Sequence, residues 1–267
     1  MKISFIGAGN MTQAFLKGLH NSPFFEHEIW VSNRSQAKLD LINHPRIKCT
    51  LDNHEAVKDA DLVILAIKPQ QMHDLLDEIR SSIKPSAIII SLAAGLRIQQ
   101  LESWLFNGVK LVRFMPNTAI SLGIGSIAIC NNQNIHTAER TMITNLFQAC
   151  GSLIDLDETQ FEVFIAASGS GIAFVYQLMA SYAQVIETLG LDEEQARTMI
   201  IDTFFAASSM AKNNSDFDDL MRRVASKGGT TIEGLNVLRT PILNTLLNEA
   251  CQKTIERSYQ LSEELQK

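Results

Sequence analysis

The first part of the chain, up to residue 113, alternates between short apolar runs and amphipathic stretches. The apolar runs are rich in β-branched residues and predict strands, whereas the stretches between them have helical spacing. This alternation is typical of strand–helix–strand units that build a parallel sheet. The predicted strands are Lys2–Ile6, Glu28–Ser32, Ile47–Cys49, Asp61–Ile67, Ala87–Ser91 and Lys110–Phe114.

Two further apolar runs, Gly125–Cys130 and Ser152–Leu156, flank a helical pattern over Thr137–Cys150 and are expected to extend the sheet at its edge. Strand signals stop after Glu158. The helices predicted beyond it cover residues 159–167, 171–189, 192–212, 229–239 and 241–265. We therefore predict an α/β fold: an N-terminal Rossmann-type, doubly wound, mostly parallel sheet over residues 1–157, then an all-α C-terminal dimerisation domain over residues 158–267.

The dimer is expected from two unusually apolar helices in the second domain. The helix predicted over 171–189 has apolar residues in nearly every direction around its axis, and the helix over 192–212 is almost as apolar. A helix that is apolar all round must be buried all round, and a domain of ~110 residues has little interior for two of them. We expect a homodimer or higher homo-oligomer formed through the C-terminal helices; a well-packed monomeric bundle is the alternative.

The composition of the 267 residues is that of a globular protein with substantial cores: 46% are hydrophobic and 19% charged. Residues 1–155 carry 14 Lys and Arg against 13 Asp and Glu, and residues 156–267 carry 9 against 16, so nucleic acid is not an expected partner. The chain opens directly on a strand pattern and shows no apolar run of the roughly 18 residues that span a membrane. A cytoplasmic protein without a membrane partner is expected. The four cysteines are far apart and predict buried thiols rather than a metal site or disulfides.

A glycine-rich turn directly follows the first predicted strand. It consists of Gly7, Ala8, Gly9, Asn10 and Met11, and an apolar helical pattern comes next. Gly7 permits a tight turn, Gly9 lets the backbone approach a pyrophosphate, and the helix start supplies free N–H groups. Thr12 occupies the third fingerprint position in place of Gly or Ala. A glycine pattern alone would fit an ordinary turn equally well. Because this one follows the first strand of a strand–helix array, a dinucleotide site is predicted.

The end of the second predicted strand, Val31–Ser35, indicates which dinucleotide is bound. Enzymes that use NAD usually place a carboxylate there, and this segment has none. Arg34 offers a permanent cation for a 2′-phosphate, and Ser32, Asn33 and Ser35 offer donors. NADPH is the predicted cofactor, with NADH weaker; a solvated helix start at Arg34 is the alternative.

Loops that follow the other parallel strands should line the same crevice, because their carboxyl ends meet at one edge of the sheet. Lys68 and Asn117 would offer donors beside the ribose or nicotinamide, although a lysine in a solvated loop has no such role. The residues expected to line the cofactor from these loops are Ala66, Ile67, Lys68, Pro69, Ala93, Ala94 and Asn117.

The segment Gly228–Thr231 precedes a predicted helix and brings bare N–H groups and two hydroxyls to its positive end. This combination predicts a carboxylate receptor; a glycine loop that only starts a helix is the alternative.

Four segments together resemble the pyrroline-5-carboxylate reductase family. They match the family's V-K-P-Q, M-P-N-T, S-G-S-G-P-A and S-P-G-G-T-T segments in order, and the resemblance covers nearly the whole chain. The segments are Ala66–Gln70, Arg113–Thr118, Ser168–Gly171 and Ser226–Thr231.

The resemblance implies NADPH-dependent reduction of L-1-pyrroline-5-carboxylate to L-proline, the last step of proline biosynthesis. It makes Thr231 and Lys68 the candidate catalytic residues, with the Thr231 hydroxyl at the ring nitrogen. It also makes Asn53 a cofactor contact, although helix capping explains that residue equally well. The implied substrate-binding residues are Ser170, Ser226, Gly228, Gly229, Thr230 and Thr231, and no metal is implied.

Three departures from the family pattern leave the exact substrate open. Lys227, Ile172 and Ala119 each stand where the family has proline, so three rigid φ angles are lost. The alternatives are a reductase of a related cyclic imino acid and a non-catalytic NADPH-binding sensor. A 3-hydroxyacid dehydrogenase is disfavoured, because that class relies on a lysine in the helix after its glycine segment. This chain has no lysine between Lys110 and Lys212.

Overall fold

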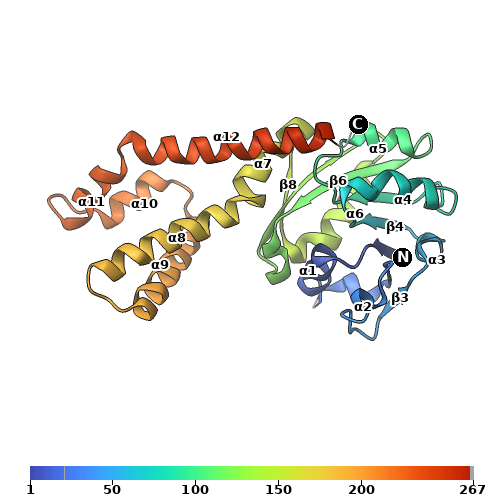
Figure 1. Cartoon of the computed structure of the whole chain (residues 1–267), viewed down its shortest axis with the longest axis horizontal. Coiled ribbons are helices and arrows are strands. Elements are labelled where there is room, and N and C mark those ends of the chain that lie inside the picture. Colours follow the sequence, from blue (N-terminus) through green and yellow to red (C-terminus); the bar gives the residue numbers. More distant parts are fainter. Residues whose placement is uncertain (21, 265–267) are drawn as a thin grey trace. The chain divides into compact units, whose positions relative to one another are not determined.

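A computed structural model describes residues 1–20 and 22–264 (Figure 1). The chain forms two compact units, Met1–Gly169 together with the chain from Thr254 onward, and Ser170–Lys253. The first unit continues past residue 157 because the helix that follows packs on the sheet: Phe161 and Phe164 form a small buried cluster with Met115 and Ala128. A domain boundary at residue 157 stays a prediction.

The first unit contains a sheet of eight strands whose order is β3-β2-β1-β4-β5-β6-β7-β8. All neighbouring strands pair in parallel except β6 and β7, so the mostly parallel sheet is confirmed. Ile6 lies opposite both Ser32 and Leu65, which brings the carboxyl ends of β1, β2 and β4 to one edge. The strands are β1 (Lys2–Ile6), β2 (Glu28–Ser32), β3 (Ile47–Thr50), β4 (Leu62–Leu65), β5 (Ile88–Ser91), β6 (Lys110–Pro116), β7 (Gly125–Asn131) and β8 (Gly151–Asp155).

Helices cover both faces of this sheet, which confirms the doubly wound fold. Alternate strand residues point into two separate cores: Phe5 and Ile64 belong to one, and Ile6 and Val63 to the other. The first core is covered by α1 (Asn10–Gly18), α2 (Gln36–Leu39) and α6 (Thr137–Phe147), and the second by α3 (Asn53–Val57), α4 (Met72–Ile79) and α5 (Ile98–Trp104). Short 3-10 turns connect these elements at η1 (Pro23–Glu26), η2 (Pro69–Gln71), η3 (Thr118–Leu122), η4 (Gln148–Cys150) and η5 (Glu158–Gln160), followed by α7 (Phe161–Phe164) and a π-helical turn, η6 (Ile165–Gly169).

The second unit is helical in the part of the chain that the structure describes, as predicted. Its elements are α8 (Gly171–Thr188), α9 (Glu193–Asn213), α10 (Phe217–Val224), α11 (Thr230–Leu238) and the first part of α12 (Pro241–Glu264). The sequence did not predict α10, an eight-residue helix in which four residues are charged. Asp216 starts it by accepting a hydrogen bond from the backbone N–H of Asp219, at 3.0 Å.

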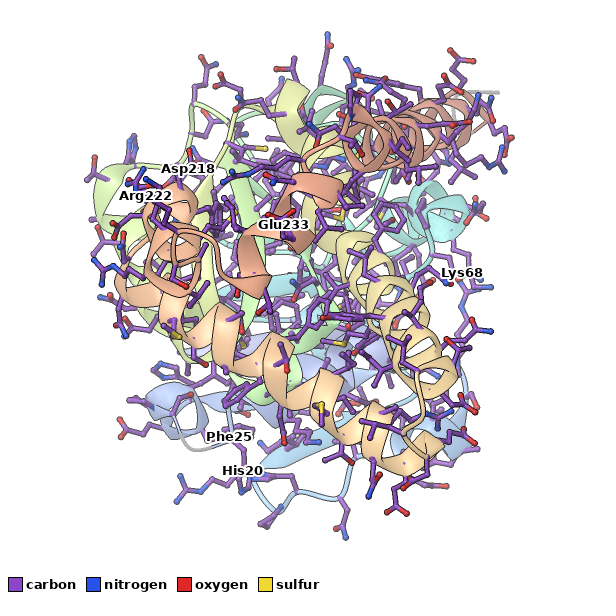
Figure 2. The ribbon with its side chains drawn as sticks, turned by 90° about the vertical axis from the view of Figure 1, so that its left-hand side faces the viewer. His20, Phe25, Lys68, Asp218, Arg222 and Glu233 are labelled. Carbon is purple, nitrogen blue, oxygen red and sulfur yellow. The ribbon has the colours of Figure 1, made fainter. Side chains whose placement is uncertain are left out.

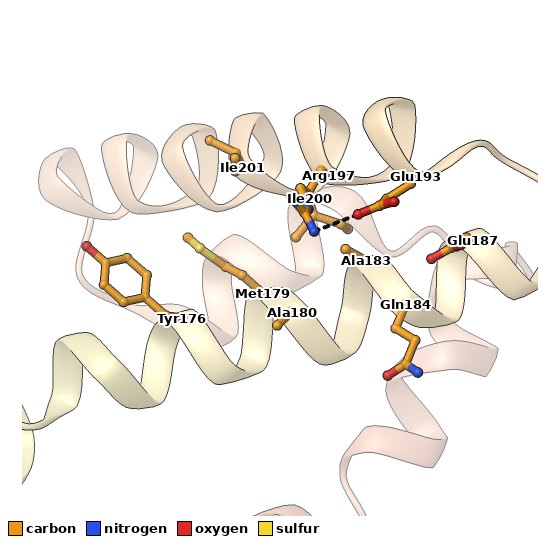
Figure 3. Close-up of a pocket in the computed structure, with 10 residues that line it drawn as sticks. All are labelled: Tyr176, Met179, Ala180, Ala183, Gln184, Glu187, Glu193, Arg197, Ile200 and Ile201. Carbon is orange, nitrogen blue, oxygen red and sulfur yellow. Dashed lines mark hydrogen bonds and ion pairs between the residues drawn. The ribbon is translucent and has the colours of Figure 1, made fainter.

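The long helices α8 and α9 pack side by side and leave much of their apolar surface uncovered (Figure 3). A groove of about 530 Å³ runs between them, lined by Tyr176, Met179 and Ile200 among others. The exposed fraction is 64% for Tyr176 and 72% for Phe205. An exposed apolar face of this size among the described residues of the second unit is typical of an interaction surface.

The expectation that no segment is long and apolar enough for a membrane is wrong by length and composition. Among the described residues, one helical stretch, Glu158–Thr188, has a mean hydropathy of 1.6 over an 18-residue window, of which 17% is buried. Small residues such as Ser168 and Gly169 interrupt the apolar run in the sequence, but they remain part of the helical stretch. A helix of this composition is weak support for a membrane, since helices buried in protein interfaces have the same character.

The cysteines only partly follow the expectation of buried thiols. Cys150 is buried and Cys130 half-buried, and burial raises the pKa of each thiol to about 12. Both thiols are therefore protonated and unreactive at neutral pH. Cys49 is exposed, because its strand, β3, forms the edge of the sheet.

Candidate functional site

The glycine turn at the end of β1 fits the tight geometry that the sequence predicts. Gly7 has φ +107°, and a Cβ atom there would lie 2.5 Å from the carbonyl oxygen of Ala66. The Gly7 N–H donates to the carbonyl oxygen of Ser32 at 2.8 Å. No described protein atom lies within 4 Å of a Cβ built at Gly9, so a ligand has room to approach the backbone there.

Thr12 explains how the turn tolerates a departure from the fingerprint. Its side chain is fully buried, and its hydroxyl donates to the carbonyl oxygen of Gly7 at 2.6 Å. The third position therefore locks the turn instead of only allowing close packing. Gly9 precedes α1 without a side-chain cap, which leaves the first N–H groups of the helix for a ligand.

A pocket of about 200 Å³ lies beside this turn at the carboxyl edge of the sheet. Arg34 lines it with a side chain that is 67% exposed. Lys38, which sequence reasoning missed, lines it as a second cation, and its spacing of four residues from Arg34 was the available signal. The pocket is lined by Ile6, Gly7, Asn33, Arg34, Ser35, Lys38, Asn53, Ile67, Gln71 and Leu75.

Asn53 belongs to a buried network and does not cap a helix. Asp52 caps α3 instead, because its carboxylate accepts the N–H of His54 at 2.8 Å. Asn53 is 7% exposed; its Oδ1 accepts from the hydroxyl of Ser32 at 2.8 Å, and its Nδ2 donates to Glu78 at 3.0 Å. Ser32 therefore reaches the pocket only through Asn53. The capping alternative for Asn53 is excluded.

Asn33 braces the pocket from the other side. Its Oδ1 accepts from the backbone N–H of Ala8 at 3.3 Å, and its Nδ2 donates to the carbonyl oxygen of Ser35 at 3.2 Å. The side chain thus ties the end of β2 to the glycine turn.

The loops after β4 and β5 lie at the same edge of the sheet. Ala66 contacts the glycine turn, and Lys68 is exposed at the start of η2 (Figure 2). Ala93 is buried, with its N–H donating to the hydroxyl of Ser91 at 3.3 Å, whereas Ala94 is exposed. The backbone here is positioned to form a wall beside the turn, but the roles of these residues stay predictions.

Asn117 is engaged in contacts with the protein. Its Nδ2 donates to the hydroxyl of Ser168 at 2.9 Å, and its Oδ1 accepts from the N–H groups of Ala119 and Ser126 at 3.1 and 3.2 Å. The side chain therefore joins two of the four motif segments across the first unit. A proline at position 119 would lack the N–H that Ala119 donates, so this departure gains a hydrogen bond as it loses a rigid φ.

Arg113 is a further motif residue whose role only the structure reveals. Its side chain is 1% exposed, pairs with Glu158 at 3.0 Å, and lies 4.5 Å from the ring centroid of Phe161. This pair fixes the start of the helical stretch that carries Ser168. The sequence separation of 45 residues hid it from pattern reasoning.

In the second unit, Ser226–Gly229 forms a tight turn that leads into α11. The N–H of Gly229 donates to the carbonyl oxygen of Ser226 at 3.0 Å, and Gly228 has φ +72°. The positive φ favours glycine at position 228, and a Cβ at Gly229 would lie 2.4 Å from the hydroxyl oxygen of Ser226, which would have to rotate away. Lys227 occupies the second position of this turn, where proline is common when the third has positive φ.

The start of α11 is bare, as the sequence predicts. Gly229 precedes the helix without a side-chain cap, and Thr230 and Thr231 are exposed in its first turn. Ser170 lies half-buried at the start of α8, where its carbonyl oxygen accepts from Ala173 and Phe174. The cofactor candidates thus lie in the first unit and the substrate candidates in the second. We call the first group the cofactor half-site and the second group the substrate half-site.

Comparison with known proteins decides which family these half-sites represent. The model of the pyrroline-5-carboxylate reductase dimerisation family matches residues 158–261, and that of the coenzyme F420-dependent NADP oxidoreductase family matches residues 2–95. The pyrroline-5-carboxylate reductase of Pseudomonas aeruginosa is 33% identical to this chain, over 99% of the chain and 98% of that protein. The chain belongs to the pyrroline-5-carboxylate reductase family.

Solved structures of the family share the fold along nearly the whole chain. The pyrroline-5-carboxylate reductase of Coxiella burnetii superposes with a TM-score of 0.90 at 32% identity and covers 97% of each chain. The Plasmodium falciparum pyrroline carboxylate reductase, solved with NADP bound, gives a TM-score of 0.83 at 25% identity over 98% of each chain. The family resemblance seen in the four motif segments is confirmed.

Proposed function

We propose that this protein reduces L-1-pyrroline-5-carboxylate to L-proline with NADPH. The observation that carries the proposal is that both half-sites, the glycine turn and the bare start of α11, are retained within a family match that spans 99% of the chain. Relatives that match nearly the whole chain are named pyrroline-5-carboxylate reductases, and the tight glycine turn and the uncapped start of α11 support the same reaction here.

The cofactor half-site fits a phosphorylated dinucleotide. Gly7, Ala8, Gly9, Asn10 and Met11 would line the pyrophosphate, and the free N–H groups at the start of α1 would donate to it, because those of Gly7 and Ala8 are already bonded to Ser32 and Asn33. Arg34 and Lys38 bind the 2′-phosphate, and Asn53 donates its remaining amide hydrogen to the adenosine ribose. The loops with Ala66, Ile67, Lys68, Pro69, Ala93, Ala94 and Asn117 border the nicotinamide end. When bound, NADPH supplies the hydride that reduces the imine carbon.

The substrate half-site receives an anion at the start of α11. The N–H groups of Thr230 and Thr231 bind the carboxylate, assisted by the positive helix end, whereas the Gly229 N–H holds the preceding turn by donating to Ser226. Ser226 and Ser170 add hydroxyl donors, and Lys227 adds a cation. The Thr231 hydroxyl hydrogen-bonds the ring nitrogen; because threonine is a poor acid, it orients an iminium already protonated by solvent. Holding this ring at reacting distance supplies most of the acceleration.

A panel of cyclic imino acids tests this proposal. NADPH oxidation is measured with rings of four, five and six atoms, each with and without the carboxylate. We expect the five-membered ring with its carboxylate to be reduced with the highest kcat/KM. A higher value for the six-membered ring would assign a related imino acid, and NADPH binding without turnover of any member would indicate a sensor.

Replacing Arg34 with alanine is expected to weaken NADPH binding by about 20-fold and leave NADH binding nearly unchanged, since a charged hydrogen bond to the 2′-phosphate is lost. Isothermal titration with each nucleotide measures both dissociation constants. Arg80→Ala, which removes an exposed guanidinium just after α4 that pairs with Asp77 at 2.8 Å, should change neither dissociation constant. Equal weakening of NADPH and NADH binding by Arg34→Ala would contradict the assignment of Arg34 to the 2′-phosphate.

We further propose that the second units of two copies cover one another through α8 and α9, and that this contact accounts for the apolar stretch Glu158–Thr188 without a membrane. The stretch lies within residues 158–261, which match the family's dimerisation model. We also propose a cytoplasmic location and no nucleic-acid partner; the nearly balanced charge of the first 155 residues supports the latter.

Replacing Phe205 of α9 with glutamate should convert the oligomer into monomers, because a charge would be buried in the proposed interface. Light scattering after gel filtration measures the mass. The matched control is Leu41→Glu in the first unit: Leu41 is 66% exposed, comparable to the 72% of Phe205. An unchanged mass for Phe205→Glu would place the interface elsewhere.

A further inference from the structure

We propose that Glu78, near the end of α4, limits how strongly this protein prefers NADPH over NADH by holding a negative charge against the 2′-phosphate site. This inference rests on the proposed use of NADPH and assigns a specificity role to a residue outside the glycine turn and the β2 loop.

The Glu78 carboxylate contacts two residues that line the pocket, and the Asn53 hydrogen bond is the one that positions it. Its Oε1 accepts from Nδ2 of Asn53 at 3.0 Å, and its Oε2 lies 3.7 Å from a terminal nitrogen of Arg34. The Glu78 side chain is only 34% exposed, whereas that of Arg34 is 67% exposed. The carboxylate is therefore held in place behind the pocket, while the guanidinium is free to turn toward a ligand.

The charges around the pocket oppose one another. Arg34 and Lys38 contribute two cations, and Glu78 contributes one anion within ion-pair distance of Arg34. The pair is long and partly exposed, so it gives little stability in the free protein. A 2′-phosphate dianion bound at Arg34 would lie one side chain away from Glu78 and be repelled by it. NADH lacks this phosphate, so the repulsion weakens NADPH alone.

Glu78 also fixes which atoms of Asn53 face the ligand. A carboxylate can only accept, so Nδ2 of Asn53 must point toward Glu78, and Oδ1 toward the hydroxyl of Ser32. One Nδ2 hydrogen remains for the cofactor. Glutamine at position 78 keeps an oxygen that accepts from Asn53 and removes only the charge.

The test compares dissociation constants of NADPH and NADH for the wild-type protein, Glu78→Gln and Asp77→Asn by isothermal titration. Glu78→Gln is expected to tighten NADPH binding by about fivefold at low salt and to leave NADH within twofold, and the gain should shrink as salt rises. Asp77→Asn removes the same charge from the next residue of α4, where the carboxylate pairs with Arg80, and should change neither constant.

Each other outcome overturns the inference. Unchanged or weaker NADPH binding in Glu78→Gln, with NADH unaffected, would mean that the carboxylate is idle or that it organises Arg34. Weaker binding of both nucleotides would mean that Glu78 acts through Asn53.

Glu78→Asp keeps the charge on a shorter side chain and should show a smaller gain in NADPH affinity than Glu78→Gln. It serves as the test variant if Glu78→Gln does not fold. Failure of the wild-type protein to bind NADPH would instead contradict the proposed function.

Discussion

Thr231→Ala is expected to lower kcat/KM for pyrroline-5-carboxylate by about 100-fold or more, because the reacting iminium loses the hydroxyl oxygen that accepts a hydrogen bond from its ring N–H. Thr231 lies exposed in the first turn of α11, so removing its hydroxyl should not disturb the folded structure of the described residues. The loss should therefore appear in turnover and not in folding. Steady-state kinetics with NADPH at saturation measure it, and the dissociation constant of NADPH should stay unchanged.

Two variants separate a chemical role of Thr231 from a local structural one. Thr231→Ser keeps the hydroxyl and should retain most of the activity. Thr240→Ala removes a threonine hydroxyl just beyond the other end of α11, where it donates to the carbonyl oxygen of Val237 at 2.9 Å, and should have no effect. Full kcat/KM in Thr231→Ala would exclude the proposed contact with the ring nitrogen.

Gly7→Ala should both destabilise the protein and abolish measurable NADPH binding. The new Cβ would lie 2.5 Å from the carbonyl oxygen of Ala66 at a φ of +107°, so the β1 and β4 loops must move apart. Clash and backbone strain together should cost about 2–4 kcal/mol of stability. Because the same movement displaces the N–H groups at the start of α1, NADPH affinity should fall by about 100-fold or more.

Gly108→Ala is the matched control for this substitution. Gly108 has φ +80°, but no described atom lies within 4 Å of a Cβ built there. It should therefore lose only the strain of about 1–2 kcal/mol and bind NADPH normally. Thermal melting with and without NADPH measures both effects. A ligand-induced shift in Gly7→Ala equal to that of Gly108→Ala would contradict the role of the glycine turn.

Much of the fold was predictable because strand and helix patterns are local properties of the chain. The strands predicted at Lys2–Ile6, Glu28–Ser32 and Ala87–Ser91 coincide with β1, β2 and β5 to within a residue. The run predicted as Asp61–Ile67 is shorter in the structure, because its last residues form the loop beside the glycine turn. The helix α10 was missed because its pattern is short and charged.

The site was less predictable where it depends on contacts between distant residues. The glycine turn and the start of α11 are each continuous in sequence and were found. The bonds from Asn53 to Glu78 and from Asn117 to Ser168 join residues 25 and 51 positions apart, and no local pattern indicates them. Thr12 was recognised as a departure from the dinucleotide-binding fingerprint and Ala119 as a departure from the family, but only the structure supplies the hydrogen bonds that explain them.

Reduction of a five-membered cyclic imino acid with NADPH is the central function proposed for this protein. The direct test measures NADPH consumption and L-proline formation together, after the wild-type protein is mixed with L-1-pyrroline-5-carboxylate. We expect one L-proline for each NADPH oxidised, and no product when the protein is omitted. Saturable NADPH binding without any formation of proline would contradict the proposed function.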